Sequence, residues 1–489
     1  MLALVLWLLA GPRIELPGTP IRVEDLVFVG LAVLCLVLRR RERTRMSPMT
    51  AGVAAVVLTG LVSAVVASVA GTVAPLTSAL FALRPAEYWI VLPAVSLLLA
   101  GRSVRWRGLL EAALAITTVL QAAFAVLQYV FQVGLGFSHA AYTRAAGLTV
   151  GPYELGAISA AFLVYWLSRR SFLLAGVAAL SLVLSVSRVS LLAAAFGVVL
   201  LGVGSLVPLL RRRGLRGPVQ EAGRRLSRTT LPLWRAAAWA ALVAVAVMAA
   251  GLDLGPSTAD AADATAPGAP TAPVTPTGPK DDSATPETVP DVASPPSNEV
   301  ASRIASTSVL GSWTAGQKAA AAVPPLLTSD QYTLAAYGGI NSWLDIAGAG
   351  AAGAEPSNLV RFFRWNLILD NIDTPREWAL GLGPSFVGPS VDGSYLRFLA
   401  DGGVVGAAAW LLLIALWLRR SPLWMISVSA TFLIGAAFID IVYAQRPMVL
   451  LWLLLAVAAG RRRDGAARPL AAEDSDHGDR AGRGARLEA

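Results

Sequence analysis

The feature that most constrains this chain is a series of long apolar blocks without aspartate or lysine, such as Ala51–Ala70 and Ala236–Gly251. An α-helix needs about 20 residues to cross the hydrocarbon core of a bilayer. Of the 489 residues, 55% are hydrophobic and 15% are charged, and the mean hydropathy is +0.62. Soluble globular proteins carry about 25% charged residues, so the sequence predicts an all-α polytopic membrane protein.

Twelve apolar segments are predicted to be transmembrane helices, and a large outer loop with short helices separates the ninth from the tenth. In order, they are Met1–Ala10, Leu26–Leu38, Ala51–Ala70, Phe81–Ala100, Gly108–Gln132, Glu154–Leu167, Phe172–Ser187, Val189–Leu209, Leu233–Gly251, Val404–Leu418, Trp424–Ile441 and Met448–Gly460. The first two are short for a span. Eleven spans is the alternative if Met1–Ala10 does not cross.

Arginine clusters between these segments predict the orientation of the chain. Six clusters hold 22 of the 40 basic residues, and each follows an even-numbered segment: Arg39–Arg45, Arg102–Arg107, Arg169–Arg170, Arg211–Arg228, Arg419–Arg420 and Arg461–Arg463. All six therefore fall on one side of the membrane. Because basic residues concentrate in cytoplasmic loops, we expect that side to be the cytoplasmic face of the plasma membrane, with both termini there.

Composition divides the chain into five parts. Residues 1–251 are expected to hold the first nine spans with their arginine-rich cytoplasmic loops, and residues 404–460 the last three. Residues 252–300 are rich in proline, threonine and alanine. Such a stretch buries too little apolar surface to fold, so it is predicted to be disordered, as is the cytoplasmic tail 461–489. Aromatic residues return in 301–403, which is predicted to be an ordered extracytoplasmic segment.

The charged and metal-binding residues narrow the function classes. The formal net charge of +9 does not predict nucleic-acid binding, because topology already explains the arginine clusters. The single cysteine, Cys35, cannot form an internal disulfide. With one cysteine and 2 histidines in the chain, neither a metal site nor a cofactor is predicted.

A few basic residues remain on the predicted outer side, and an unpaired charge near the membrane is costly. Those that we consider candidates for binding an anion are Arg144, Arg188, Arg361, Arg364 and Arg397. The planar guanidinium group binds phosphate through two parallel hydrogen bonds, so several arginines facing one outer cavity would hold a diphosphate. A carboxylate beside them, such as that of Asp392, would accept a proton from a sugar hydroxyl.

Simpler roles for the arginines stay open. Arg188 would cap the carboxyl end of a helix and reach lipid headgroups. One of Arg361 and Arg364 would be solvated or face lipid. Arg397 would pair with Asp401, four residues later on the same helix.

Two helices are expected in the outer segment near these residues. Leu359–Asp370 has an amphipathic pattern, and a second helix is expected to begin near Ser394. Either Asp392 or Ser394 would then cap its amino end, which is the structural alternative to a catalytic role for Asp392.

Three sequence blocks lie at the outer ends of predicted spans. RAAGLTVGPYELGA covers residues 144–157, LSVSRVSLLAAAFGVVLL covers 184–201, and residues 361–414 contain GLGPSFVGPSVDGSYLRFLADGG. In this order and on one face, the three blocks resemble the signature segments of the O-antigen ligase and Wzy-type polysaccharide polymerase superfamily. With the layout of the spans, the resemblance covers most of the chain except residues 256–298.

The resemblance implies a metal-independent glycosyltransferase of exopolysaccharide or cell-wall biosynthesis that acts on the outer face of the membrane. Its donor would be a glycan on polyprenyl diphosphate. The acceptor would be another lipid-linked repeat unit, for a polymerase, or a different carrier, for a ligase. Membrane lipids and other polysaccharide-assembly proteins are further expected partners.

The resemblance also suggests roles for residues. Arg188 and one arginine of the pair Arg361 and Arg364 would hold the diphosphate, with Arg144 as a further candidate. Asp392 would stand where ligases have a histidine that activates the acceptor hydroxyl. Tyr395 and Arg397, in the same segment, would bind substrate.

The chain departs from the family pattern at two points. Gly393 stands where the family has asparagine, and the expected histidine is absent, since His139 and His477 lie elsewhere. The missing histidine favours a polymerase over a ligase. It leaves open whether Asp392 acts as a base or only orients the acceptor.

Two other functions compete with glycosyl transfer. The main alternative is a multi-pass transporter or flippase of lipid-linked oligosaccharides, and the other is a membrane scaffold with an extracellular tether. Transporters often contain internal repeats, which this sequence does not show. The clustering of polar residues on one predicted face favours a one-sided reaction.

Overall fold

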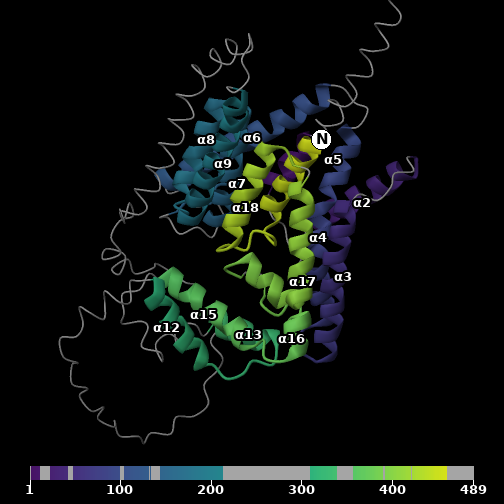
Figure 1. Cartoon of the computed structure of the whole chain (residues 1–489), viewed down its shortest axis with the longest axis vertical. Coiled ribbons are helices and arrows are strands. Elements are labelled where there is room, and N and C mark those ends of the chain that lie inside the picture. Colours follow the sequence, from purple (N-terminus) through teal and green to yellow (C-terminus); the bar gives the residue numbers. More distant parts are fainter. Residues whose placement is uncertain are drawn as a thin grey trace, which may run out of the picture.

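The structure is a computed structural model that describes residues 2–11, 23–41, 48–99, 104–131, 133, 144–212, 309–338, 356–388, 391–419 and 421–459. These residues form helices and connecting turns, and none of them is in a strand. The prediction of an all-α fold is therefore confirmed for the described part of the chain. Figure 1 shows two levels, a large bundle above and a small layer below, joined by long helices on the right of the view.

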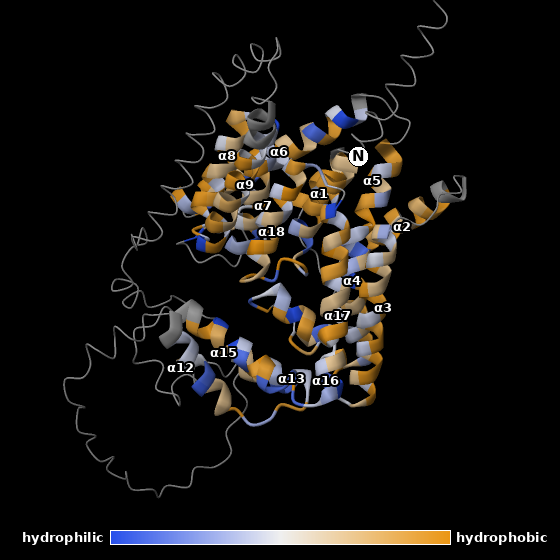
Figure 2. Cartoon of the chain, in the orientation of Figure 1, coloured by the Kyte–Doolittle hydropathy of each residue, from blue (hydrophilic) through white to orange (hydrophobic). Residues whose placement is uncertain are grey.

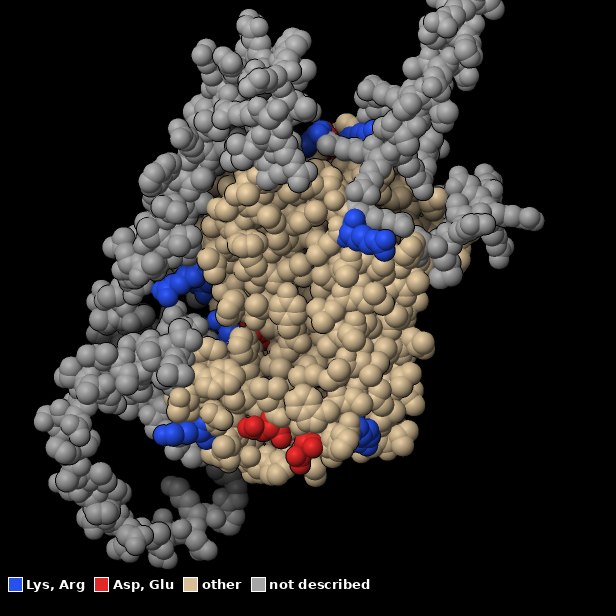
Figure 3. Space-filling model, in the orientation of Figure 1, with Lys and Arg blue, Asp and Glu red and all other residues tan. Residues whose placement is uncertain are grey.

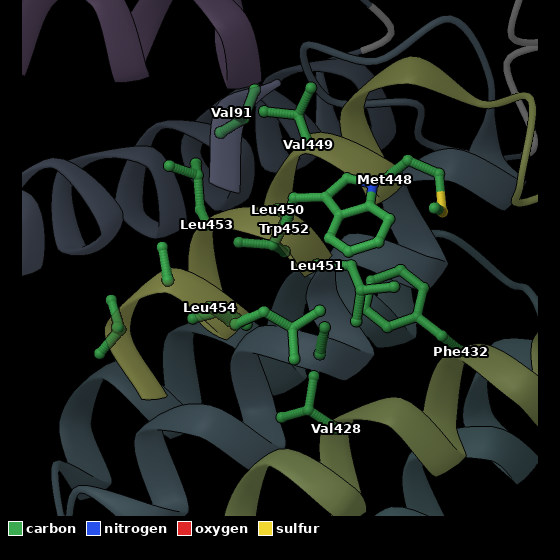
Figure 4. Packing of buried hydrophobic residues seen from close by; sticks show 14 of the residues in the cluster. Val91, Val428, Phe432, Met448, Val449, Leu450, Leu451, Trp452, Leu453 and Leu454 are labelled. Carbon is green, nitrogen blue, oxygen red and sulfur yellow. The ribbon is translucent and has the colours of Figure 1, made fainter. Parts of the chain in front are cut away.

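The upper bundle buries most of the apolar core. It consists of α1 (Leu2–Ala10), α5 (Val91–Leu99), α6 (Val104–Val130), α7 (Pro152–Ser168), α8 (Phe172–Leu184), α9 (Arg188–Arg212), α18 (Leu423–Ala436) and a last helix, Gln445–Ala459. Small side chains on α7, including Ala157, Ala160 and Ala161, are buried and let neighbouring helices approach closely. Figure 4 shows the centre of this core, where Phe432 of α18 points towards Leu451 of the last helix.

Long helices connect the two levels. α3 (Pro48–Val69) packs against both α4 (Pro75–Trp89) and α17 (Ser394–Arg419), and α2 (Val23–Arg41) packs against α4 and α5. Several large apolar side chains on α3 remain exposed, for example Leu58 and Val65, each at 63%. Such a surface suits lipid rather than water as its surroundings.

The lower layer contains short helices with a core of their own. It consists of α12 (Val309–Ala321), α13 (Ser329–Thr333), the π-helical turn η1 (Leu334–Gly338), α15 (Pro356–Asp370) and α16 (Pro375–Leu380). Phe363, Tyr332 and Phe386 lie in its core, with α12 packed against α15. Capping boxes at Thr328 and Thr374 start α13 and α16, because each threonine side chain accepts a hydrogen bond from the third residue of its helix. The predicted amphipathic helix Leu359–Asp370 is confirmed within α15.

A sharp kink divides α17 at Gly403, whose φ of 61° and ψ of −158° are not helical. The end of α16 fits into this kink: the N–H of Leu382 donates to the carbonyl of Ala400 at 2.7 Å. The start of α17 at Ser394 confirms the helix predicted to begin near that residue. The kink at Gly403 coincides with the boundary predicted between the outer segment 301–403 and the span that follows.

Five helices are long and apolar enough to cross a membrane: Pro48–Val69, Pro75–Leu99, Trp106–Val130, Arg188–Ser205 and Ser394–Arg419. They correspond to five of the twelve predicted spans. Figure 2 shows the apolar colour running along them and along the upper bundle. Phe172–Leu184, Leu423–Ala436 and Gln445–Ala459 are apolar but shorter.

The count of twelve spans is not confirmed. Met1–Ala10 corresponds to the nine-residue helix α1, whose Leu8 and Leu9 are buried, and Leu26–Leu38 lies within α2. The predicted ninth span, Leu233–Gly251, lies outside the described residues, as do the segments 252–300 and 461–489 that were predicted to be disordered.

Candidate functional site

Two of the predicted site residues, Arg364 and Asp392, contact each other. Nη1 of Arg364 on α15 lies 2.8 Å from Oδ2 of Asp392, and the two side chains are 16% and 23% exposed. The neighbouring Trp365 donates its indole N–H to the backbone carbonyl of Asp392 at 2.7 Å. The carboxylate of Asp392 is therefore held by α15 and does not act as the cap of α17.

Tyr337 and Ala336 of the lower layer also contact Arg364. The guanidinium of Arg364 lies 4.2 Å from the centre of the Tyr337 ring and donates from Nε to the carbonyl of Ala336 at 3.1 Å. Burial raises the pKa of Tyr337, and the nearby charge of Arg364 opposes this effect only in part. Tyr337 therefore keeps its proton at neutral pH and remains a hydrogen-bond donor.

Gly393 has a steric role next to this pair. A Cβ atom at this position would lie 3.1 Å from the carbonyl oxygen of Ala437 and 3.4 Å from the Trp365 ring. These contacts are tight, so a glycine fits between the two groups better than a larger residue would.

Arg397 lies deeper and is 0% exposed. Its Nε is 2.7 Å from Oδ2 of Asp440, and its Nη1 is 3.9 Å from Oδ2 of Asp401. Nη2 donates to the carbonyl of Gly388 at 2.9 Å, and the guanidinium packs 4.4 Å from the centre of the Tyr443 ring. The expected contact with Asp401 is present, but Asp440 is the closer partner. In this arrangement Arg397 binds protein carboxylates rather than a ligand.

The other two predicted residues of this region have different positions. Arg361, also on α15, is buried at 8% exposure. Tyr395 is 38% exposed and donates its hydroxyl to the carbonyl of Leu433 at 2.8 Å, which ties the start of α17 to the end of α18. Accessibility thus favours Arg364 over Arg361 as the ligand-binding arginine of the pair.

Arg144 and Arg188 flank the turn between α8 and α9. Arg144 donates from Nη2 to the carbonyl of Val186 at 3.0 Å and from Nε to that of Ser185 at 3.4 Å, and its guanidinium packs 4.8 Å from the centre of the Tyr153 ring. The carboxyl end of α8 is therefore capped by Arg144. Capping of a helix end had been the simpler role considered for Arg188. Arg188 is exposed and begins α9.

A chain of contacts places both groups of residues at the same end of the bundle. Arg446 donates to the carbonyls of Leu148, which follows Arg144, and of Gly11. Arg446 lies in the first turn of the last helix, three residues after Tyr443, whose ring packs against Arg397. The hydroxyl of Ser394 donates to the carbonyl of Ile439 at 3.1 Å. Figure 3 shows basic side chains on the left of the view, where the upper bundle meets the lower layer.

Basic residues from two of the predicted cytoplasmic clusters lie at the opposite ends of their helices. Arg169 follows α7, seventeen residues from its start beside Tyr153, and its Nη2 lies 2.5 Å from Oε1 of Glu111. At about 1.5 Å per residue, α7 is about 25 Å long. Arg419 ends α17, far along the helix from Ser394. Within the described ranges, the candidate site and these clusters are thus separated along the helices.

The sequence does not indicate a role for Tyr337. Asp440 and Arg446 flank the turn between the predicted spans Trp424–Ile441 and Met448–Gly460, and this position fits an internal ion pair as well as it fits a functional role. Tyr337 contacts Arg364 from a segment 27 positions earlier, and no local pattern indicates this. The contact of Asp440 with Arg397 could have been suspected only from the position of this acidic residue beside a predicted outer turn. Among the described residues, no three His, Cys, Asp or Glu side chains come together as metal ligands.

Comparison of the chain with models of protein families, with curated proteins and with solved structures finds no match. The geometry of the candidate residues is therefore the basis for a functional proposal.

Proposed function

We propose that the protein is a membrane glycosyltransferase that polymerises polyprenyl-diphosphate-linked oligosaccharide units into a cell-surface polysaccharide, with ligation to another carrier as the closely related reaction. The observation that carries the proposal is the accessible Arg364–Asp392 pair at the same end of the bundle as Arg144 and Arg188. A carboxylate beside several arginines fits a reaction between a hydroxyl and a sugar diphosphate.

The arginines would bind the diphosphate. Arg188 is exposed at the amino end of α9, where the helix dipole also favours an anion. Arg364 is partly exposed and has a planar guanidinium that suits a phosphate. Arg144, fixed by its contacts with the end of α8, adds positive charge near Arg188.

Asp392 would position the acceptor. In the proposed reaction, an acceptor hydroxyl attacks the anomeric carbon, the bond from this carbon to the diphosphate oxygen breaks, and the electron pair leaves with the polyprenyl diphosphate. The hydroxyl proton passes to Asp392 or to the departing diphosphate. Binding of the diphosphate by Arg364 would weaken the ion pair, so Asp392 would become free to accept this hydrogen bond only when donor is present.

We further propose that the chain crosses the plasma membrane twelve times, with both termini in the cytoplasm and the Arg364–Asp392 pair on the outer side. The separation of Arg169 and Arg419 from the candidate site along α7 and α17 supports this orientation.

Loss of glycan elongation in two variants tests the function. Purified full-length protein would be supplied with a lipid-diphosphate-linked repeat unit extracted from the same cells, and chain length would be measured by mass spectrometry. We expect Arg364→Ala and Asp392→Ala to slow elongation about 100-fold, as the loss of one charged group that stabilises a transition state typically does. Arg364→Lys should retain part of the rate, because it keeps the charge but loses the planar fork.

Arg376→Ala is the matched control, because Arg376 lies on the same layer with an exposed side chain that pairs with the neighbouring Glu377 at 3.4 Å. It should elongate glycan at the wild-type rate. Normal elongation by folded Arg364→Ala and Asp392→Ala variants would show that the proposed site is wrong. Transfer of the lipid-linked unit across a vesicle membrane without new glycosidic bonds would instead identify a flippase.

Thiol labelling tests the orientation. In a Cys35→Ser background, single cysteines would be placed at Asp330, exposed in the lower layer, and at Ser171, in the turn between α7 and α8. A membrane-impermeant thiol reagent should label Asp330→Cys in intact cells and Ser171→Cys only after the membrane is opened. The reverse pattern, or labelling of both in intact cells, would contradict the proposed topology.

A further inference from the structure

A small cavity lies beside Asp401, apart from the candidate site. Its wall is formed by Val56, Thr59 and Gly60 of α3, by Ala82 and Pro85 of α4, and by residues around the kink of α17. It measures about 20 Å³, which is room for a single water molecule. Because Val56, Thr59 and Gly60 lie near the middle of α3, Asp401 is a carboxylate that faces the centre of a helix long and apolar enough to cross a membrane.

The carboxylate of Asp401 is buried and weakly partnered. The residue is 6% exposed, and among the described side chains the Tyr443 hydroxyl is the hydrogen-bonding neighbour of its carboxylate. Nη1 of Arg397 is 3.9 Å from Oδ2, which is beyond the distance of a hydrogen bond. The hydroxyl of Tyr443, which lines the same cavity, is near the carboxylate.

The charges around Asp401 do not balance if it is ionised. Arg397 is the basic group that faces it, and this guanidinium already lies 2.7 Å from Asp440 and binds the Gly388 carbonyl. α3 contributes no charged residue to the cavity wall. On α4, Arg84 is stacked on Phe81, whose ring packs against Tyr443. Two ionised carboxylates with one guanidinium would leave a net negative charge in a buried site, which is costly.

We propose that Asp401 is a proton-binding site, with its carboxyl group protonated in the folded protein at neutral pH. The protonated carboxyl donates its hydrogen bond to the Tyr443 hydroxyl or to a water molecule in the cavity. Thr59 would support such a water, because its hydroxyl donates to the carbonyl of Val56 at 2.9 Å and so has lone pairs free to accept.

A proton fits this site better than a metal cation does. Hard cations such as Ca²⁺ and Mg²⁺ take about six oxygen ligands, whereas the side-chain oxygens in the cavity wall come from Asp401, Thr59 and Tyr443. The cavity is also too small for an ion with its water shell.

The site lies where a change in charge would affect the outer half of α17. If Asp401 loses its proton, its carboxylate competes with Asp440 for Arg397, which also holds the Gly388 carbonyl. Proton binding would thus stabilise the arrangement of the segment that carries Asp392. This inference does not depend on glycosyl transfer.

Thermal unfolding of the purified full-length protein as a function of pH tests the proposal. In an unfolded chain Asp401 is ionised above about pH 4, so at neutral pH the folded state binds one more proton than the unfolded state. Stability should therefore decrease as pH rises. We expect the Tm of the wild type to fall by several degrees as the pH rises from about 6 to about 8.5. The Tm of Asp401→Asn should fall less over the same range.

Infrared spectroscopy provides a second measurement that does not require a stable variant. The wild type at neutral pH should show a carboxylic acid C=O band that shifts in D₂O. Asp401→Asn should lose this band, Asp401→Glu should change its frequency, and the exposed control Asp330→Asn should leave both the band and the pH dependence unchanged.

Three results would overturn the proposal. One is a wild-type protein without a carboxylic acid band at neutral pH, and another is a band that Asp401→Glu leaves unaltered. The third is a rise in wild-type Tm in NaCl relative to choline chloride that Asp401→Asn abolishes, because this would show that a metal cation occupies the site. None of these measurements depends on enzymatic activity, so their failure is distinguishable from failure of the proposed function.

Discussion

Replacement of Arg397 by methionine is expected to lower the free energy of unfolding by about 3–5 kcal/mol, the typical cost of removing one partner of a buried ion pair. Arg397 is fully buried, and its Nε lies 2.7 Å from Asp440. Methionine fills a similar volume, so the loss of charge rather than a cavity would cause the effect. The side chain also holds the Gly388 carbonyl, which would lose its donor.

Asp440→Asn should destabilise the protein less than Arg397→Met does. When Asp440 is neutral, Asp401 can ionise and take its place as the partner of Arg397, since Oδ2 of Asp401 is already 3.9 Å from Nη1. When Arg397 is absent, no described basic residue can replace it beside Asp440. Unfolding of the purified proteins in mixed detergent micelles would measure both free energies.

Arg376→Met is the control for this comparison, because its exposed pair with Glu377 should contribute at most about 1 kcal/mol. Equal stability of the wild type and Arg397→Met would contradict the structural role of Arg397. If Asp440→Asn lowers the free energy of unfolding more than Arg397→Met does, Asp401 cannot replace Asp440 as the partner of Arg397.

Gly403→Ala is the second substitution with a large expected effect. The backbone at Gly403 is left-handed, with a φ of 61°, and a Cβ atom there would lie 2.3 Å from the carbonyl carbon of Ala379 and 2.5 Å from the backbone nitrogen of Leu380. We expect a loss of about 1–3 kcal/mol for the backbone conformation, since φ of 61° with ψ of −158° is essentially confined to glycine, and about 1–3 kcal/mol more for the overlap with α16. Thermal unfolding in detergent would measure the sum.

Substitutions at two other glycines separate these causes. At Gly402 a Cβ would meet no atom within 4 Å, so Gly402→Ala should be neutral or slightly stabilising. At Gly71 there is also free space, but φ is 76°, so Gly71→Ala should lose only the backbone part. A Gly403→Ala protein as stable as Gly71→Ala would mean that α16 does not pack into the kink.

Part of the candidate site was predictable because its signals are local. The amphipathic pattern of Leu359–Asp370 is a property of one helix, and so is the helix start at Ser394. The contact between Arg397 and Asp401 follows from their spacing of four residues. Each of these features depends on residues within a few turns of one another.

The partners of the site residues were not predictable in the same way. Arg364 meets Asp392 from 28 residues away, and Arg397 meets Asp440 from 43 residues away. Asp392 had the equally reasonable alternative of capping α17. Which contact forms depends on how α15 lies against the start of α17, and no spacing rule contains that information.

The sequence by itself determined that the chain is helical and apolar enough for a membrane, because hydropathy and helix length are local properties that the bilayer tests one segment at a time. It also indicated which arginines, on the side predicted to be outer, need an anionic partner. Only the tertiary structure decided which of them are already neutralised. Arg397 is buried against carboxylates, Arg144 caps α8, and Arg364 remains partly accessible beside Asp392. The physical reason is that a charge is stabilised by groups within a few ångströms of it, and the packing of helices distant in sequence determines which groups those are.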